Sequence, residues 1–141
     1  MDGEQRHVES RMSADDLSAL VEFRTVAWPS IPDDPGVYAI FDRDELVYVG
    51  MAGRNGKGSL RNRLRDHSSG QIVNMFAQYL FLARVQFLPA TRITHPREAK
   101  AACQAYIAER CSFRYRVTAD GAEARRLEAH LKTELKPTLN P

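Results

Sequence analysis

The sequence lacks any apolar run long enough to cross a membrane, and its first eleven residues are polar, with no signal-peptide core. Cysteine is also scarce. Only Cys103 and Cys111 are present, and their spacing matches no zinc signature. These absences argue against a membrane-spanning protein, a secreted disulfide scaffold and a zinc finger. We therefore expect a cytoplasmic protein that makes no membrane contact and keeps both thiols free.

Strong net charge is absent as well. The formal charge is only +2, which argues against a highly basic nucleic-acid coat protein. With 141 residues, 43% of them hydrophobic and 27% charged, the chain has the composition of one soluble globular domain. Yet 16 of its 20 cationic residues are arginine, the side chain that binds phosphate through two parallel hydrogen bonds. Biased codon usage explains this excess equally well, so the positions of the arginines matter more than their number.

Two apolar segments, residues 36–41 and 46–50, flank the polar residues 42–45, a pattern that predicts a β-hairpin. A loop of three residues, 43–45, is one of the common hairpin lengths. It would pair Asp42 with Leu46, Tyr38 with Gly50 and Ile40 with Tyr48.

Opposed residues of a hairpin share a face, so this register places Tyr38 and Tyr48 side by side. The other face is then wholly apolar and consists of Val37, Ala39, Phe41, Val47 and Val49. A two-residue loop would separate the two tyrosines, which is why the sequence favours the longer one.

Outside the hairpin, the periodicity of apolar residues and the capping residues predict further elements. Before the hairpin we expect a short amphipathic helix after Ser13 and Asp16 that ends near Trp28, and a proline-rich lead-in over 31–35. After the hairpin we expect a flexible glycine-rich connection over 51–58, a helix over 60–67 capped by Ser59, a helix over 72–80 and a short strand over 85–88. The last part should contain a helix beginning at Pro96, a strand over 113–118 and a helix capped by Asp120 that ends before Pro137. Together they indicate an α+β fold, a small antiparallel sheet built on the hairpin and flanked by helices.

Two of these helices carry ionisable residues on their apolar sides. Helical spacing puts Arg63 and His67 on the same face as Leu60 and Leu64, while Glu128 lies within a leucine stripe. Burying a charge is costly unless a partner is present. A structural salt bridge between Arg63 and Glu128 is one explanation. A cleft that cleaves phosphodiesters is the other, because a carboxylate binds Mg²⁺ and an arginine stabilises the transition state.

The tripeptides Gly36-Val37-Tyr38 and Tyr48-Val49-Gly50 resemble the motif that names the GIY-YIG nucleases. The remaining matches follow in the family's order: Arg63, His67, Glu128 and Asn140. The resemblance covers roughly residues 35–141 and is interrupted by an apparent insertion within 71–110. Valine replaces isoleucine in both tripeptides, and the glycine-rich segment is longer than in many members.

The resemblance implies a role for each matching residue. Tyr38 would act as the general base or would orient the water, and Tyr48 and His67 would position water and phosphate. Because a free phenol titrates near pH 10, nearby cations would have to lower the pKa of Tyr38 if it is the base. Arg63 would stabilise the transition state, Glu128 would hold one Mg²⁺ (or Mn²⁺), and Asn140 would brace the site.

Four further cations are candidates for contacting DNA phosphates. Arg54 and Lys57 lie in the glycine-rich connection, and Arg61 and Arg65 are expected on the solvent side of the helix over 60–67.

The extent of the resemblance also predicts the division of the chain. We expect residues 1–34 to form a tail, a short helix and a lead-in, and residues 35–141 to form a nuclease domain with an inserted segment at about 71–110.

The resemblance implies a metal-dependent DNA endonuclease that leaves 5′-phosphate and 3′-hydroxyl ends. Related domains serve in homing endonucleases, excision repair, restriction and junction resolution. The alternative is a non-catalytic DNA-binding module that retains the fold. Since we expect no room for a separate DNA-reading domain, specificity would come from the N-terminal helix, the insertion within 71–110, a homodimer or a partner protein.

Overall fold

A computed structural model describes residues 16–71, 74–88 and 93–140, and it contains a four-stranded sheet in the order β1-β4-β2-β3. Every pairing in this sheet is antiparallel. The strands are β1 (Val21–Glu22), β2 (Gly36–Asp42), β3 (Glu45–Ala52) and β4 (Cys111–Val117). The α-helices are α2 (Leu60–Ser68), α3 (Met75–Ala83), α4 (Pro96–Arg110) and α5 (Gly121–Leu135), joined by the short 3₁₀ helices η2 (Trp28–Ser30), η3 (Arg54–Gly56) and η4 (Val85–Phe87). The predicted α+β architecture is confirmed.

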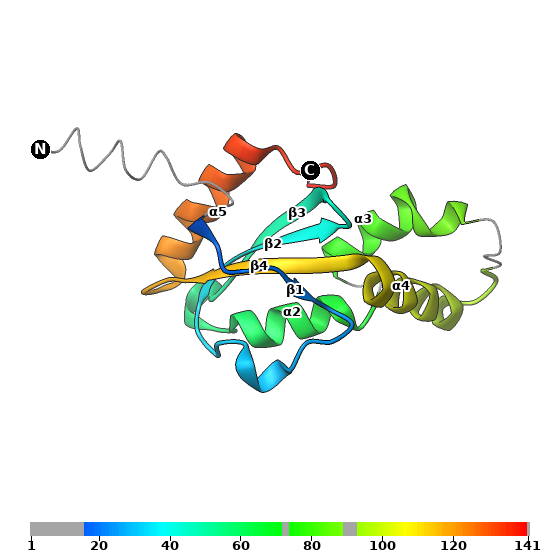
Figure 1. Cartoon of the computed structure of the whole chain (residues 1–141), viewed down its shortest axis with the longest axis horizontal. Coiled ribbons are helices and arrows are strands. Elements are labelled where there is room, and N and C mark those ends of the chain that lie inside the picture. The colour runs from blue at the N-terminus through cyan, green and yellow to red at the C-terminus, as the bar shows by residue number, and fades with distance from the viewer. Residues whose placement is uncertain (1–15, 72–73, 89–92, 141) are drawn as a thin grey trace, which may run out of the picture.

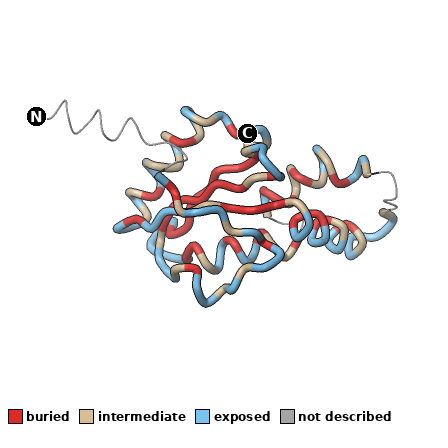
Figure 2. The backbone as a smooth tube through the Cα atoms, in the orientation of Figure 1, coloured by how far each residue is buried: buried red, intermediate tan, exposed pale blue. Residues whose placement is uncertain are grey.

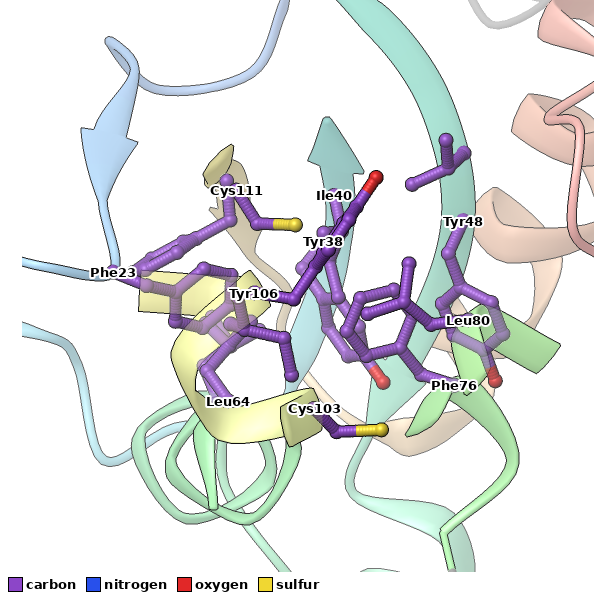
Figure 3. Close-up of a cluster of buried hydrophobic side chains, with 14 of the residues drawn as sticks. Phe23, Tyr38, Ile40, Tyr48, Leu64, Phe76, Leu80, Cys103, Tyr106 and Cys111 are labelled. Carbon is purple, nitrogen blue, oxygen red and sulfur yellow. The ribbon is translucent and has the colours of Figure 1, made fainter. Parts of the chain in front are cut away.

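Helices cover both faces of the sheet (Figure 1). Helix α5 lies on one face, where an apolar cluster unites Val37, Ala39, Val49, Met51, Ala124 and Leu131. Helices α2, α3 and α4 contribute to a larger cluster that includes Tyr38, Tyr48, Leu64, Phe76 and Ile107. The buried residues follow the central strands between these layers (Figure 2). Both predicted tyrosines therefore belong to one core, and Figure 3 labels them among the side chains of this cluster together with Phe76 and Leu80.

The hairpin has the predicted tyrosine arrangement, but its loop is shorter than predicted and one strand contains a bulge. Its loop contains two residues, Arg43 and Asp44, so Asp42 pairs with Glu45, and the predicted pairing of Asp42 with Leu46 is wrong. A β-bulge after Ile40 restores the register, so that the predicted pairs Tyr38–Gly50 and Ile40–Tyr48 are both present.

The bulge has a second effect, because an extra residue on one strand changes which face the following side chains occupy. Val47 packs in the tyrosine cluster, whereas Leu46 packs against the cluster beneath α5. The prediction that Val47 shares a face with Val37 and Val49 is therefore wrong.

The amphipathic helix predicted near Leu17 is not present in its described part, and Ser13 lies outside the described residues. Instead, Val21 and Glu22 form β1 and pair with Phe113 and Ser112. The aromatic rings of Phe23 and Phe113 lie 4.8 Å apart between centroids, so tertiary packing overrides the helical pattern here. The domain boundary after residue 34 stays a prediction, and β1, which precedes it, belongs to the same sheet.

The remaining elements agree with the sequence except at two places. The connection predicted over 51–58 is wrong in part, because Met51 and Ala52 belong to β3 and Arg54–Gly56 forms η3. Ser59 caps α2 by accepting from the Asn62 N–H, and Asp120 caps α5 by accepting from the Glu123 N–H. Helix α4 begins at Pro96 as predicted, and α3 begins at Met75, while Ile72 and Val73 lie outside the described residues. The predicted strand over 85–88 is wrong, because Val85–Phe87 forms the 3₁₀ helix η4.

A polar network ties the segment over 71–110 to the hairpin end. Nη1 of Arg84 lies 2.6 Å from Oδ2 of Asp42, and Nη2 lies 2.8 Å from Oε2 of Glu45. Tyr106 also donates to the buried carboxylate of Asp42. Thr138 donates to Glu45 over 2.6 Å, so the tail joins the same network. In the described part of the chain, no helix is both long and apolar enough to cross a membrane.

Candidate active site

A cleft of about 530 Å³ opens between β3, the glycine-rich connection, α2 and α5. Five of the six predicted catalytic side chains line it: Tyr38, Tyr48, Arg63, Glu128 and Asn140. The sixth, His67, has no accessible surface and lies behind Tyr38. Residues that are far apart in the sequence, such as Tyr38 and Asn140, thus line the same cleft.

Gly36 and Gly50, the two glycines of the tripeptides, lie where the neighbouring atoms leave no room for a side chain. A Cβ on Gly50 would lie 2.3 Å from the hydroxyl oxygen of Tyr38, and one on Gly36 would lie 2.3 Å from the carbonyl oxygen of Arg116. Real Cβ atoms do not approach other atoms so closely. Gly50 therefore leaves room for the phenol that crosses over it, and Gly36 allows β2 to lie against β4 beside Leu60.

The Tyr38 hydroxyl oxygen lies 2.6 Å from Nε2 of His67, and Nδ1 of the same ring lies 3.2 Å from Oδ1 of Asn74. Burial, followed by the charge of Arg63, lowers the pKa of His67 to about 3, so the imidazole is neutral at neutral pH. Burial also raises the pKa of Tyr38 above its usual value, with Tyr48 adding to the shift and Arg63 opposing it. In the protein alone, the charge of Arg63 does not outweigh burial, and Tyr38 is a neutral phenol.

Burial raises the pKa of Tyr48 too, and the charge of Arg63 again opposes the shift. The ring of Tyr48 meets the ring of His67 edge-on, with 5.8 Å between centroids. Tyr48 is therefore also a neutral hydroxyl at the cleft.

The cations predicted to contact DNA are placed differently from one another. Arg54 and Lys57 line the cleft, and Arg65 is exposed on α2. Arg61 does not extend freely into solvent, as its solvent-side position predicted. Its Nε donates to the carbonyl of Ile31 over 2.9 Å, and Nη2 donates to the carbonyl of Pro29 over 3.4 Å. This arginine holds the lead-in against α2.

Glu128 enters the cleft from α5, with its side chain 15% exposed. Its ion pair among the described residues is with Lys132, one helical turn later, at 3.7 Å. The predicted structural salt bridge to Arg63 is absent from the described ion pairs, although Arg63 lines the same cleft. Glu128 thus presents a carboxylate to the cleft beside two cations.

Asn140 joins the C-terminal tail to the outer edge of β3. Its Oδ1 accepts from the Val49 N–H over 2.7 Å, and its Nδ2 donates to the Val49 carbonyl over 3.0 Å. The tail continues this pairing through backbone bonds from Thr138 to Leu46 and from Leu139 to Val47. Asn140 therefore fixes the strand that carries Tyr48.

Sequence reasoning missed three residues of this region. Lys132 and Asp66 line the cleft, and Asn74 contacts His67 from behind it. Lys132 follows Glu128 by four residues, a helical spacing that could have revealed it. Asn74 directly precedes the apolar run of α3, where an asparagine is a common N-cap, but nothing in the sequence indicates that it also reaches His67.

No family model and no curated protein matches the chain. Among solved structures it is similar to the GIY-YIG N-terminal endonuclease domain of UvrC from Thermotoga maritima, bound to its catalytic divalent cation, magnesium. The identity is 23% and the TM-score 0.44, over 81% of this chain and 91% of that one. A point mutant of the same domain, also bound to its catalytic divalent cation, matches with the same identity and TM-score over 81% and 90%. Both are domains of the family that the motifs predicted.

Proposed function

We propose that this protein is a metal-dependent DNA endonuclease that hydrolyses a phosphodiester to a 5′-phosphate and a 3′-hydroxyl. The supporting observation is that Arg63, Glu128 and two neutral tyrosines converge on one cleft, with a neutral histidine bonded to one of the phenols. Arginine, carboxylate and a proton-accepting pair are the groups that this hydrolysis needs.

Glu128 is the residue that would hold a divalent cation. Within the described residues, no three His, Cys, Asp or Glu side chains come together as a closed metal site. Mg²⁺ does not need one, because it keeps several waters and is held through one or two carboxylates together with substrate phosphates. A carboxylate that is 15% exposed and faces the cleft fits this requirement. Such a cation, when bound, neutralises charge on the phosphate and on the leaving oxygen.

Arg63 supplies the positive charge that the protein itself brings to the phosphate. Its side chain is exposed at the cleft, and Arg54 and Lys57 line the same opening. A guanidinium there can donate to the non-bridging oxygens as negative charge accumulates on them. Arg54, Lys57 and Arg65 would hold flanking phosphates, and Arg61 would support the lead-in.

Tyr38 and His67 act as a pair on the attacking water. In the protein alone, burial raises the pKa of Tyr38, so the side chain is a phenol and not a tyrosinate at neutral pH. It can accept the water's proton while passing its own proton to Nε2 of His67, 2.6 Å away, provided that Nε2 carries no proton. Tyr48 would orient the water or the phosphate, and Asn140 would keep β3 in place.

The test is cleavage of supercoiled plasmid and of branched DNA by purified protein with Mg²⁺ or Mn²⁺. Glu128→Gln should abolish nicking, and a chelator should do the same to the unaltered protein. Glu134→Gln is the matched control, because it removes the same charge from an exposed site on the same helix and should cleave normally.

Cleavage that survives Glu128→Gln would refute the metal assignment. Binding of every DNA form by the unaltered protein without any cleavage would favour the non-catalytic module instead. Both outcomes can be separated from misfolding by the thermal unfolding curve of each variant.

A further inference from the structure

Asn74 is held in one orientation by three backbone groups. As the N-cap of α3, its Oδ1 accepts from the Ala77 N–H over 2.8 Å. Its Nδ2 donates to the carbonyl of Gln71 over 2.8 Å and to that of Asp66 over 3.3 Å. Rotating the amide by half a turn would set its NH₂ against an N–H and its oxygen against two carbonyls. The oxygen of Asn74 must therefore face Ala77.

The same oxygen lies 3.2 Å from Nδ1 of His67. An amide oxygen can only accept, so Nδ1 must carry the hydrogen of this bond. Because the pKa of His67 is lowered, the ring holds one proton only at neutral pH, and Nε2 is left bare. The Tyr38 hydroxyl then donates to Nε2 over 2.6 Å. Of the two lone pairs on the phenol oxygen, one can accept from Arg63, which hydrogen-bonds to Tyr38, and the other stays open to the water.

We propose that Asn74 is a positioning residue that selects the Nδ1–H tautomer of His67 and thereby makes Tyr38 a proton acceptor toward the cleft. This inference rests on the proposed nuclease function for its consequence, but the tautomer itself is a property of the protein without DNA. In the opposite tautomer, Nε2–H would donate to the phenol oxygen and occupy the lone pair that the water needs.

The proton balance of the step is complete. The water oxygen forms the new bond to phosphorus as its proton moves to the Tyr38 oxygen, and the Tyr38 proton moves to Nε2 of His67. The bond from phosphorus to the 3′-oxygen breaks, and that oxygen keeps the electron pair and takes a proton from solvent. His67, now doubly protonated, still donates from Nδ1 to Asn74 and returns its extra proton through Tyr38 to water after release.

The groups that face His67 are consistent with this role. Tyr38 and Tyr48 approach from the strands, Phe76 approaches from α3, and Arg63 lies one turn away on the same helix. Among these described groups, Asn74 is the one whose hydrogen bond reaches Nδ1, and Tyr48 meets the imidazole edge-on. Phe76 is apolar, and Tyr38 is already bonded to the other nitrogen.

The experiment reads the tautomer directly, by long-range ¹H–¹⁵N correlation NMR of the histidine rings in metal-free protein at neutral pH. His95 is an internal reference, because its Nδ1 accepts from the Arg97 N–H and so favours the opposite tautomer. For the unaltered protein we expect the Nδ1–H form of His67. An Nε2–H signal for His67 would overturn the proposal.

Two variants separate positioning from capping, since serine and aspartate are both good N-caps. Asn74→Ser leaves Nδ1–H without its amide acceptor, so the tautomer equilibrium should shift by about tenfold toward the Nε2–H form. Turnover of a DNA substrate at saturation should fall with the fraction of the Nδ1–H tautomer that remains, with KM unchanged. Asn74→Asp retains the acceptor and adds a charge. It should keep the Nδ1–H tautomer and raise the pKa of His67, which shifts the acid limb of the pH–rate profile upward.

A purely structural cap would leave both variants like the unaltered protein in tautomer, turnover and pH profile, and that result would overturn the inference. If the unaltered protein shows the Nδ1–H tautomer, and Asn74→Ser loses it, but no DNA is cleaved, the positioning role stands and the nuclease function fails. The two failures therefore remain distinguishable.

Discussion

The buried His67 predicts a loss of stability in mild acid that can be calculated from its pKa. Burial, with the charge of Arg63, lowers this pKa from about 6.5 to about 3, while the hydrogen bond from Nδ1 to Asn74 opposes the shift. The unfolded chain therefore binds a proton on this ring at pH values where the folded chain does not. Stability from the neutral ring is fully present above about pH 6.5 and is lost as the pH falls toward 3.

The magnitude follows from about 1.4 kcal/mol for each pH unit between these limits. Lowering the pH from about 8 to about 5 should reduce the free energy of unfolding by about 2 kcal/mol through His67 alone. The assay is urea unfolding followed by circular dichroism at several pH values, for the unaltered protein and for His67→Gln. Carboxylates titrate in both proteins, so the difference between the two free energies isolates the histidine.

His67→Gln will lower stability at neutral pH because the site is buried, so the test is the pH slope and not the absolute value. The control is His95→Asn, which removes an exposed histidine, keeps a capping residue for α4 and should retain the slope of the unaltered protein. A difference between the unaltered protein and His67→Gln that stays constant from about pH 8 to about pH 5 would refute the reasoning.

Three further predictions concern the cleft and its supports. Arg63→Ala should slow single-turnover cleavage at saturating DNA by about 100-fold or more, with little change in the melting temperature because the side chain is exposed. A destabilised variant that cleaves normally would contradict this. Gly50→Ala should lower the free energy of unfolding by about 1–3 kcal/mol, since the new methyl meets the Tyr38 hydroxyl, and an unchanged urea midpoint would count against the close approach. Arg65→Ala should weaken DNA binding and reduce the salt slope by about one, whereas Arg61→Ala should lower the melting temperature and leave affinity intact. The reverse pattern would reassign the two arginines.

The hairpin shows how far the sequence predicts this fold. The expectation that Tyr38 and Tyr48 share a face correctly predicted that Tyr38 pairs with Gly50 and Tyr48 with Ile40, because alternation along strands is a local property. The sequence did not reveal whether the odd residue lies in the loop or in a bulge, since both solutions give the same pairs around the tyrosines. The side chains of Val47 and Leu46 distinguish the two solutions, and both pack on the sides that the bulge requires.

Other misses have a common physical cause, which is contact between distant segments. Val21 and Glu22 form a strand because they pair with the edge of β4, and the local spacing of apolar residues contains no information about this distant partner. Asn74 looks like an ordinary cap from its neighbours, and its contact with His67 depends on how α2 and α3 pack. Arg61 was assigned to solvent from helical phase alone, whereas the lead-in folds back to meet its guanidinium.

The pairing of the tail with β3 affects how the molecule meets other chains. A sheet with exposed edges invites further strands to add to it, which leads to aggregation or to unplanned partners. Here β1, at one edge, is only two residues long, and the outer edge of β3 already bonds to Thr138, Leu139 and Asn140. Another copy of the chain could pair along Leu46, Val47 and Val49 only after displacing the tail. Asn140, which lines the cleft, thus also helps to protect the sheet from edge-to-edge association.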